Sequence, residues 1–450
     1  MNSNKRVFAL VSICFIIFFV FSFLSSAFKL NTLAFDKVNL LNDLFPKKLP
    51  SSVIPSGIIN QDLSEKTKDQ LANINNEAID FELYKKGDLI TNFKQTTQPS
   101  LPHLIEKLFR LKKGEAVKIR IAYFGDSMIE SDLLTQTLRK LLQQHYGGVG
   151  VGYLPLSSNV AEFRHTASVK GTGWEDQHLK TSGVTNVYLS GHSFLGKGEG
   201  IYTDHTYPKD NIKNVQKALL FGKTNGVEVS VNNQTVTLKG NQLVNRLILN
   251  DNVDSAIQIK SNCTVPLYGI TFESEQGVFV DNFSFRGITG IEYKCLQDDY
   301  IKAIQATNEY DLVVLQYGVN MMFRPNDTDY TYYQKMFSPV LSKFKTAFSN
   351  ADILLIGAAD RAFRYDGVYK TAIGLPNLVQ LQAQMAFDNG FAFFNLFQTM
   401  GGENSIVRWA EQQPSLANKD YIHPNGRGAN ILGEKIFEAI QKEFNKYSHH

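Results

Sequence analysis

The sequence predicts an α/β protein in which a three-layer parallel sheet carries an inserted β-sandwich domain and follows an N-terminal membrane or signal segment. Three observations lead to this prediction. A strand pattern at 117–124 precedes a helix pattern at 131–146, and helices and strands alternate again from about residue 296. Between about 156 and 280, helical periodicity gives way to short alternating runs. Residues 7–23 are apolar and follow Lys5 and Arg6.

The composition bounds the size and the class of the protein. At 450 residues, the chain can bury one α/β core and one β-domain. Its formal net charge is +3, 20% of its residues are charged, and no basic cluster alternates with aromatic residues. We therefore expect no nucleic-acid partner. Three cysteines are too few for a disulfide framework, and whether Cys263 pairs with Cys295 stays open.

Residues 1–27 are predicted to be a signal peptide or a signal anchor. The apolar run 7–23 is near the lower length limit for a membrane span, and Ser25-Ser26-Ala27 could be a cleavage site. A buried helix of the folded domain is the alternative. The basic flank predicts that the rest is exported, either anchored to the inner membrane by 7–23 or released into the periplasm.

Residues 28–97 are polar and contain three prolines, which predicts a stalk or arm with one or two short helices, such as 63–78. From Pro102, a helix pattern at 103–111 leads to the first strand of the sheet. The main domain is therefore expected to begin near residue 98.

The first strand ends at Gly125 and leads through Asp126 and Ser127 into the helix pattern at 131–146. Open α/β sheets bind ligands at the carboxyl ends of their strands, where backbone N–H groups and helix N-termini gather. Ser127 therefore lies where a nucleophile is useful, with Asp126 as the residue that caps the turn. Taken alone, the tripeptide is also typical of an ordinary turn with an N-cap.

A second motif, Asp420-Tyr421-Ile422-His423-Pro424, lies some 290 residues further along the chain. A serine hydroxyl needs a base within hydrogen-bond reach, and the base needs a third group that fixes its tautomer. Asp420 and His423, three residues apart on one turn, can supply both. His423 alone could equally be a surface turn histidine, but the two motifs together predict a Ser-His-Asp triad.

This pair of motifs resembles the SGNH (GDSL-type) hydrolases, whose four short blocks supply a nucleophilic Ser, an oxyanion-hole Gly, an oxyanion-hole Asn and a His with an Asp three residues before it. Gly125-Asp126-Ser127 is similar to the first block, and Asp420 with His423 is similar to the last. Gly318-Val319-Asn320, which directly follows the apolar run 311–317, resembles the Asn block.

The Gly block corresponds to 285–290, where Gly290 is preferred to Gly287. The resemblance implies a flavodoxin-like sheet with strand order 2-1-3-4-5. It also implies an oxyanion hole made by the N–H groups of Ser127 and Gly290 and the side-chain amide of Asn320.

The β-rich stretch separates the first family block from the second. This arrangement, with a carbohydrate-module-like domain after the serine block, resembles the peptidoglycan O-acetylesterases. We therefore expect the hydrolase domain to comprise 98–155 and 281–450, and the inserted β-sandwich to comprise 156–280.

Other residues are candidates for binding. Arg324, Arg361 and Arg364 follow the third and fourth predicted strands and could hold a substrate carboxylate, although solvated charges would look the same. Trp174 and Trp409 could stack on sugar rings or pack in the core.

Two patterns predict no ligand. The glycines at 147–152 follow a helix, so they are expected to cap it instead of binding phosphate. No histidine near the insert has a second ligand at metal-binding spacing, so no metal and no other cofactor is expected.

The resemblance implies a serine esterase that removes O-acyl groups, above all O-acetyl groups, from cell-wall glycan (peptidoglycan). An O-acetyltransferase acting on peptidoglycan or exopolysaccharide would use the same triad and would need a membrane acyl-donor partner. A glycan-binding protein with an idle triad is the alternative from another class. The membrane is expected to contact only the N-terminal segment.

Overall fold

The structure, a computed structural model, describes residues 78–207 and 214–448. The predicted signal segment and most of the predicted polar arm lie outside these residues. None of the helices in the described part of the chain combines the length and apolar character that crossing a bilayer requires.

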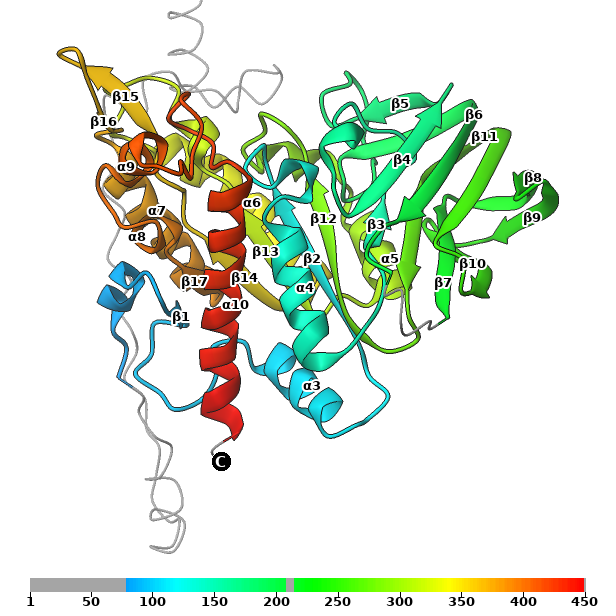
Figure 1. Cartoon of the computed structure of the whole chain (residues 1–450), viewed down its shortest axis with the longest axis horizontal. Helices are drawn as coiled ribbons and strands as arrows, with labels where there is room; N and C mark the ends of the chain where they lie inside the picture. The colour runs from blue at the N-terminus through cyan, green and yellow to red at the C-terminus, as the bar shows by residue number, and fades with distance from the viewer. Residues whose placement is uncertain (1–77, 208–213, 449–450) are drawn as a thin grey trace, which may run out of the picture. The chain divides into compact units, whose positions relative to one another are not determined.

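A six-stranded sheet with the order β1-β17-β14-β13-β2-β12 forms the centre of the domain (Figure 1). Five of its strands run parallel: β2 (Lys118–Gly125), β12 (Gly277–Ser284), β13 (Leu312–Gln316), β14 (Asp352–Ile356) and β17 (Ala392–Phe394). Numbered along the chain, these strands lie in the order 2-1-3-4-5, which confirms the expectation. Every residue of β13 is buried because helices cover both faces of the sheet.

The register of the three strands at one edge determines what meets at their carboxyl ends. Gly125, the last residue of β2, is paired with Ser284 of β12 on one side and with Gln316 of β13 on the other. All three strands therefore end at the same level. The loops that follow them, including the predicted serine, glycine and asparagine blocks, begin side by side.

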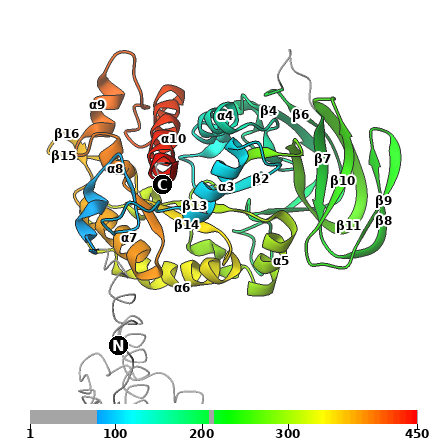
Figure 2. The same cartoon turned by 90° about the horizontal axis from the view of Figure 1, so that it is seen from below.

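Six long helices form the outer layers (Figure 2). One layer holds α3 (Pro102–Lys112), α4 (Thr135–Tyr146) and α10 (Gly426–Ser448), and the other holds α5 (Asp298–Asn308), α6 (Thr331–Ala347) and α7 (Leu375–Asn389). Two short helices, α8 (Leu396–Thr399) and α9 (Ser405–Glu411), follow β17. The helix predicted from residue 131 begins only at Thr135, because a 3₁₀ turn (Glu130–Asp132) with positive φ at Ser131 and Asp132 precedes it.

Residues 78–97, the described part of the predicted arm, pack on the domain. A 3₁₀ turn (Phe81–Lys85) leads to β1 (Ile90–Thr91), which pairs antiparallel with β17. Tyr84 and Phe93 are buried and make ring contacts with Phe393. The boundary expected near residue 98 therefore falls inside packed structure. A few apolar side chains anchor this segment, and the average polarity of 28–97 conceals them.

The inserted stretch forms a second sheet of nine strands. They are β3 (Gly152–Leu154), β4 (Ala167–Thr172), β5 (Glu175–His178), β6 (His192–Asp204), β7 (Val215–Phe221), β8 (Thr224–Val231), β9 (Gln234–Gly240), β10 (Asn245–Asn252) and β11 (Ala256–Glu273). β11 joins the two halves, because its first part pairs with β6 and β8 and its last part pairs with β7 and β3. Side chains from both halves share one apolar core, so the sheet folds over on itself.

One predicted strand of the insert, at 187–190, is a loop in the structure. Val187, Tyr188 and Leu189 are fully buried, but they pack in the core of the α/β domain. Their apolar character therefore reflects contact with the other domain and not pairing in a sheet. By contrast, the turn predicted at Asn232-Asn233 is present, with φ of 49° and 64°, and joins β8 to β9.

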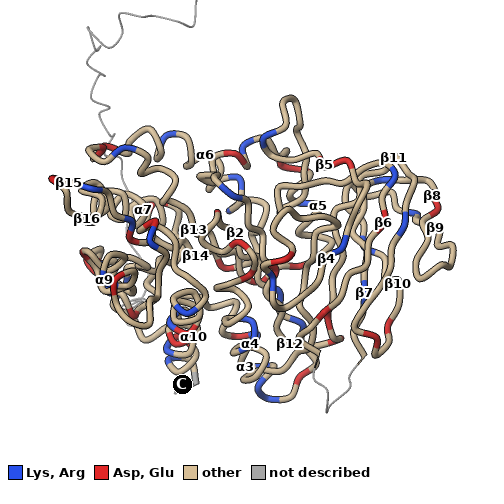
Figure 3. Tube along the Cα trace, turned by 45° about the horizontal axis from the view of Figure 1, so that its top comes forward, with Lys and Arg blue, Asp and Glu red and all other residues tan. Residues whose placement is uncertain are grey.

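Buried charges join the insert to the α/β domain. Glu273 of β11 has no exposed side-chain surface and accepts hydrogen bonds from Arg120 of β2 and Arg246 of β10. Elsewhere, Lys, Arg, Asp and Glu are intermixed along both domains (Figure 3). The glycines at 147–152 run between the domains, and Gly147 caps α4 as predicted.

Candidate active site

Ser127 lies in the turn directly after β2, at the carboxyl edge of the parallel strands. Its hydroxyl Oγ is 2.8 Å from Nε2 of His423. The sequence produces this turn because Asp126 folds back on it: Oδ1 of Asp126 accepts a hydrogen bond from the N–H of Met128 at 2.9 Å, as expected of a capping residue.

His423 lies 296 residues away in sequence, in a tight loop before α10. A bridge between Ala417 and Pro424 closes the loop, and the N–H of Asn418 donates to the carbonyl of His423. The ring nitrogen Nδ1 of His423 lies 2.7 Å from Oδ2 of Asp420. A proton on Nδ1 leaves the lone pair of Nε2 to accept the Ser127 proton, so the three residues form a continuous hydrogen-bonded chain.

The carboxylate of Asp420 is fixed on both sides. Its Oδ1 accepts the backbone N–H groups of Ile422 (2.9 Å) and His423 (3.1 Å), and its Oδ2 faces the ring. Burial alone would raise the pKa of Asp420, but the hydrogen bonds from His423 and the backbone outweigh it and hold the pKa below its ordinary value. The group that orients the ring is therefore ionised at neutral pH.

Asn320 follows β13 and faces the serine turn from the neighbouring strand. Its Nδ2 donates to Oδ2 of Asp126 and to the carbonyl of Ile288, both at 2.9 Å. This amide thereby connects the ends of β2, β12 and β13. Burial raises the pKa of Asp126 to about 7, although the hydrogen bonds from Met128 and Asn320 lower it.

The two candidate glycines of the second block have different surroundings. Gly290 is buried, and a Cβ there would lie 2.6 Å from the ring of Phe337 and 2.9 Å from that of Tyr317. Gly287 is exposed, and its Cβ side meets only Nζ of Lys180 at 3.4 Å. The two glycines therefore differ in exposure and in the room for a side chain.

The three candidate arginines occupy different places. Arg361 is half-buried, and its NH1 donates to the carbonyl of Val319, the residue before Asn320. Arg364 is exposed, and its Nε donates to Gly367 within the hairpin of β15 (Ala362–Tyr365) and β16 (Val368–Thr371). Arg324 is exposed and lies over the ring of Phe323. Only Arg361 is hydrogen-bonded to a loop of the site.

Both tryptophans pack against an apolar core, and the two later cysteines form no disulfide in the described part of the chain. Trp409 is buried in the main core, and Trp174 packs against the core of the insert, where Gly198 leaves room for its ring. Cys263 and Cys295 are both unpaired.

No motif in the sequence indicates the network that ties the segment after Ser127 to the insert. Asp132, fully buried, accepts hydrogen bonds from Arg139 of α4 at 2.7 and 2.8 Å and from Thr166 of the insert at 2.7 Å, and Arg164 of the insert lies 3.3 Å away. Burial alone would raise the pKa of Asp132, but the charges of Arg139 and Arg164 hold it well below its ordinary value. Only spatial proximity reveals these partners, since their spacing along the chain follows no motif.

Comparison with known proteins supports the fold. No protein-family model matches the sequence, and no curated protein is similar to it at a significant level. A solved structure of a peptidoglycan O-acetylesterase matches with a TM-score of 0.65 at 22% identity, over 76% of this chain and 96% of that chain.

Two further solved structures match less closely. One is a family two carbohydrate esterase from Cellvibrio japonicus, with 10% identity and a TM-score of 0.26 over 62% of this chain and 99% of that one. The other is a salicylyl-acyltransferase from a tetracycline biosynthetic pathway, with 11% identity and a TM-score of 0.31 over 66% and 94%. The match to the peptidoglycan O-acetylesterase shows that the chain has the expected SGNH-type esterase fold.

Proposed function

We propose that this protein is a serine esterase that removes O-acetyl groups from cell-wall glycan, with peptidoglycan as the substrate. The observation that carries the proposal is the hydrogen-bonded chain from Ser127 through His423 to Asp420 at the carboxyl edge of the sheet. The likeness in fold to a peptidoglycan O-acetylesterase supports the choice of substrate.

In the first half of the reaction, Ser127 attacks the ester carbonyl while Nε2 of His423 takes its proton. Asp420 stabilises the imidazolium that forms. The tetrahedral intermediate then collapses, the proton passes from His423 to the departing sugar hydroxyl, and the acetyl group stays on Ser127. In the second half, a water molecule gives a proton to His423 and attacks the acyl-enzyme, which releases acetate and restores the serine.

The negative charge on the carbonyl oxygen needs donors at the same edge. We assign this role to the backbone N–H groups of Ser127 and Gly290 and to the amide of Asn320, which has to release the carbonyl of Ile288 because both of its protons are donated in the structure. Gly290 is the preferred glycine of the block at 285–290, and the exposed Gly287 is the alternative. Each such donor typically contributes about 3 kcal/mol to stabilising the transition state.

Arg361 is the candidate for holding a substrate carboxylate. Its guanidinium donates to the carbonyl of Val319, the residue before Asn320, and interacts electrostatically with the charge of Asp420. Arg324 and Arg364 would reach only substrate that extends beyond the triad. We place the enzyme outside the cytoplasm, where its glycan is found, with residues 1–27 as its export signal or anchor.

The experiment is acetate release from O-acetylated peptidoglycan by the full-length protein. Ser127→Ala serves as the control, and a parallel reaction contains an added sugar acceptor. We expect serine-dependent release of free acetate. If acetyl groups instead appear on the added sugar with little free acetate, the protein is a transferase, and a membrane acyl-donor partner becomes the next hypothesis to test. If Ser127→Ala releases acetate at the normal rate, the triad assignment is refuted and a glycan-binding role gains support.

A further inference from the structure

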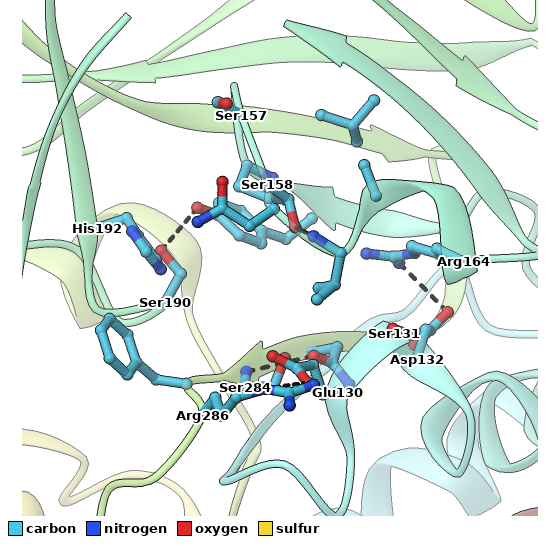
Figure 4. Close-up of a pocket in the computed structure, with 18 of the residues that line it drawn as sticks. Glu130, Ser131, Asp132, Ser157, Ser158, Arg164, Ser190, His192, Ser284 and Arg286 are labelled. Carbon is cyan, nitrogen blue, oxygen red and sulfur yellow. Dashed lines mark hydrogen bonds and ion pairs between the residues drawn. The ribbon is translucent and has the colours of Figure 1, made fainter. Parts of the chain in front are cut away.

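A cavity of about 250 Å³ lies between the serine turn and the inserted β-domain (Figure 4). The 3₁₀ turn that follows Ser127 contributes Glu130, Ser131 and Asp132, and the last residue of β12 and the two residues after it contribute Ser284, Phe285 and Arg286. The rest of its wall comes from the insert, mainly from the loop around Ser157 and from the strands that carry Asp176 and His192. The cavity therefore exists only because the insert packs beside the serine turn.

The turn that lines this cavity has an unfavourable backbone conformation. Ser131 and Asp132 have φ of 59° and 64°, the left-handed region that non-glycine residues rarely adopt. The buried ion pairs of Asp132 with Arg139 and Arg164 hold the turn in place. Strained backbone persists where the surrounding structure enforces it, and such positions cluster at functional sites. Here the enforced position is that of Ser131, which faces the cavity.

The cavity presents hydroxyl groups that the protein does not use. In the described part of the chain, the side-chain hydroxyls of Ser131, Ser157 and Ser284 have no hydrogen-bond partner in the protein. Figure 4 shows these three serines on different walls of the cavity. Each hydroxyl can donate and accept, so together they suit a ligand with several hydroxyl groups.

Most charged groups of the wall are paired within the protein, but Asp132 is shared by Arg139 and Arg164, and NH2 of Arg164 has no hydrogen-bond partner among the described residues. Arg164 is paired with Asp132, and Nε of Arg286 donates to Glu130 at 2.8 Å. Nδ1 of His192 lies 2.9 Å from Asp176. An uncharged ligand would leave these pairs intact.

One wall is apolar. The ring of Phe285 stacks on that of His192, with centroids 4.9 Å apart, and both rings line the cavity. The C–H face of a sugar ring packs well against such a surface. The volume is slightly below the roughly 300–1,000 Å³ of typical drug-sized pockets, which leaves room for a single ring.

We propose that this cavity is a saccharide subsite that holds one uncharged pyranose ring of the acylated glycan next to the 3₁₀ turn that follows Ser127. The inference rests on the proposed esterase function and specifies its substrate: the insert is a wall of the substrate site and not a separate anchor for polymer. The serine hydroxyls bind the sugar hydroxyls, and the Phe285–His192 wall contacts the ring face.

The test compares two substrates in one set of variants of the full-length protein. Ser157→Phe fills the cavity from the insert side, and Ser157→Ala removes only the hydroxyl. Thr237→Phe, on the exposed face of β9 in the same insert, is the matched control. Each variant is assayed on p-nitrophenyl acetate, which needs no sugar subsite, and on O-acetylated peptidoglycan.

For Ser157→Phe we expect kcat/KM on the glycan to fall about tenfold or more, with the rate on p-nitrophenyl acetate changed by less than about twofold. Ser157→Ala should lose a few-fold on the glycan alone, and Thr237→Phe should match wild type on both. Equal glycan activity in Ser157→Phe and Thr237→Phe overturns the proposal. If Ser157→Phe loses both activities together, the result for Ser157→Ala decides between the two explanations. An unchanged rate of Ser157→Ala on the glycan then also overturns the proposal.

A binding measurement separates failure of the subsite from failure of the proposed function. Calorimetry with Ser127→Ala and tri-N-acetylchitotriose, an uncharged probe, should detect binding that Ser127→Ala/Ser157→Phe lacks. A trigalacturonate, which is anionic, should bind more weakly. If wild type hydrolyses neither substrate but the trisaccharide binds through Ser157, the esterase proposal fails and the subsite stands. No difference in binding between the single and the double variant refutes the subsite.

Discussion

Replacing Asp420 by Asn tests the triad through the tautomer of His423. The two oxygens of Asp420 have separate partners: Oδ1 accepts two backbone N–H groups, and Oδ2 accepts the proton on Nδ1 of His423. An asparagine keeps the backbone hydrogen bonds only if its oxygen occupies the Oδ1 position. Its NH₂ group then faces Nδ1 and donates to it, which moves the ring proton to Nε2. A protonated Nε2 cannot accept the proton of Ser127.

The magnitude follows from counting these hydrogen bonds. The opposite orientation of the asparagine would lose two backbone hydrogen bonds of about 1 kcal/mol each. The inactive tautomer is therefore favoured by about 2 kcal/mol, or roughly 30-fold. The loss of the carboxylate charge beside the imidazolium adds to this penalty, so we expect kcat to fall by about 10³-fold or more.

The assay is the initial rate on p-nitrophenyl acetate at neutral pH, with urea unfolding to check that the fold is intact. Asp366→Asn, on the exposed turn between β15 and β16, is the matched control and should retain wild-type activity. If Asp420→Asn keeps more than about a tenth of the wild-type kcat, this account of His423 is wrong.

Two further predictions concern the surroundings of the triad. Asp132→Asn leaves two buried arginines without a counter-charge and should lower the free energy of unfolding by about 3–5 kcal/mol in urea, whereas Glu199→Gln, in an exposed ion pair, should change it by less than about 1 kcal/mol. The folded-state pKa of Asp132 is lowered, so its stabilising effect should be present above the ordinary pKa of 3.8 and be lost as the pH falls. A difference in the free energy of unfolding between wild type and variant that stays constant down to low pH would contradict this. Gly290→Ala, whose methyl group would meet the ring of Phe337 at positive φ, should cost about 1–3 kcal/mol of stability. Gly287→Ala, at an exposed position whose Cβ side meets only Lys180, should cost less stability, and an equal loss in the two variants would contradict this.

The alternation of strands and helices could be predicted from the sequence, because buried parallel strands and amphipathic helices have distinct periodicities. The order of the strands came from the resemblance to the SGNH hydrolases. The three residues of the proposed triad could also be predicted. A serine nucleophile, its base and its orienting acid have few chemical substitutes, and Asp420 and His423 are close in sequence. Their proximity to Ser127 follows once the sheet is formed.

Other features could not be predicted because they depend on contacts between distant segments. Val187 to Leu189 have the composition of a strand but pack as a loop in the neighbouring domain. The left-handed turn at Ser131 and Asp132 replaces the expected first turn of α4, since burial of Asp132 between two arginines outweighs the local preference for helix. No local pattern indicates either outcome.

The sequence by itself therefore determined the class of fold and the chemical identity of the triad, because periodicity and reactive side chains are properties of short segments. Only the tertiary structure decided what surrounds Ser127. The common end of β2, β12 and β13 brings Asn320 to the serine turn, where it donates to Asp126. The insert packs against the serine turn and forms the cavity beside it. Burial, the pairing of charges and the shape of a cavity arise only when segments far apart in the chain come together.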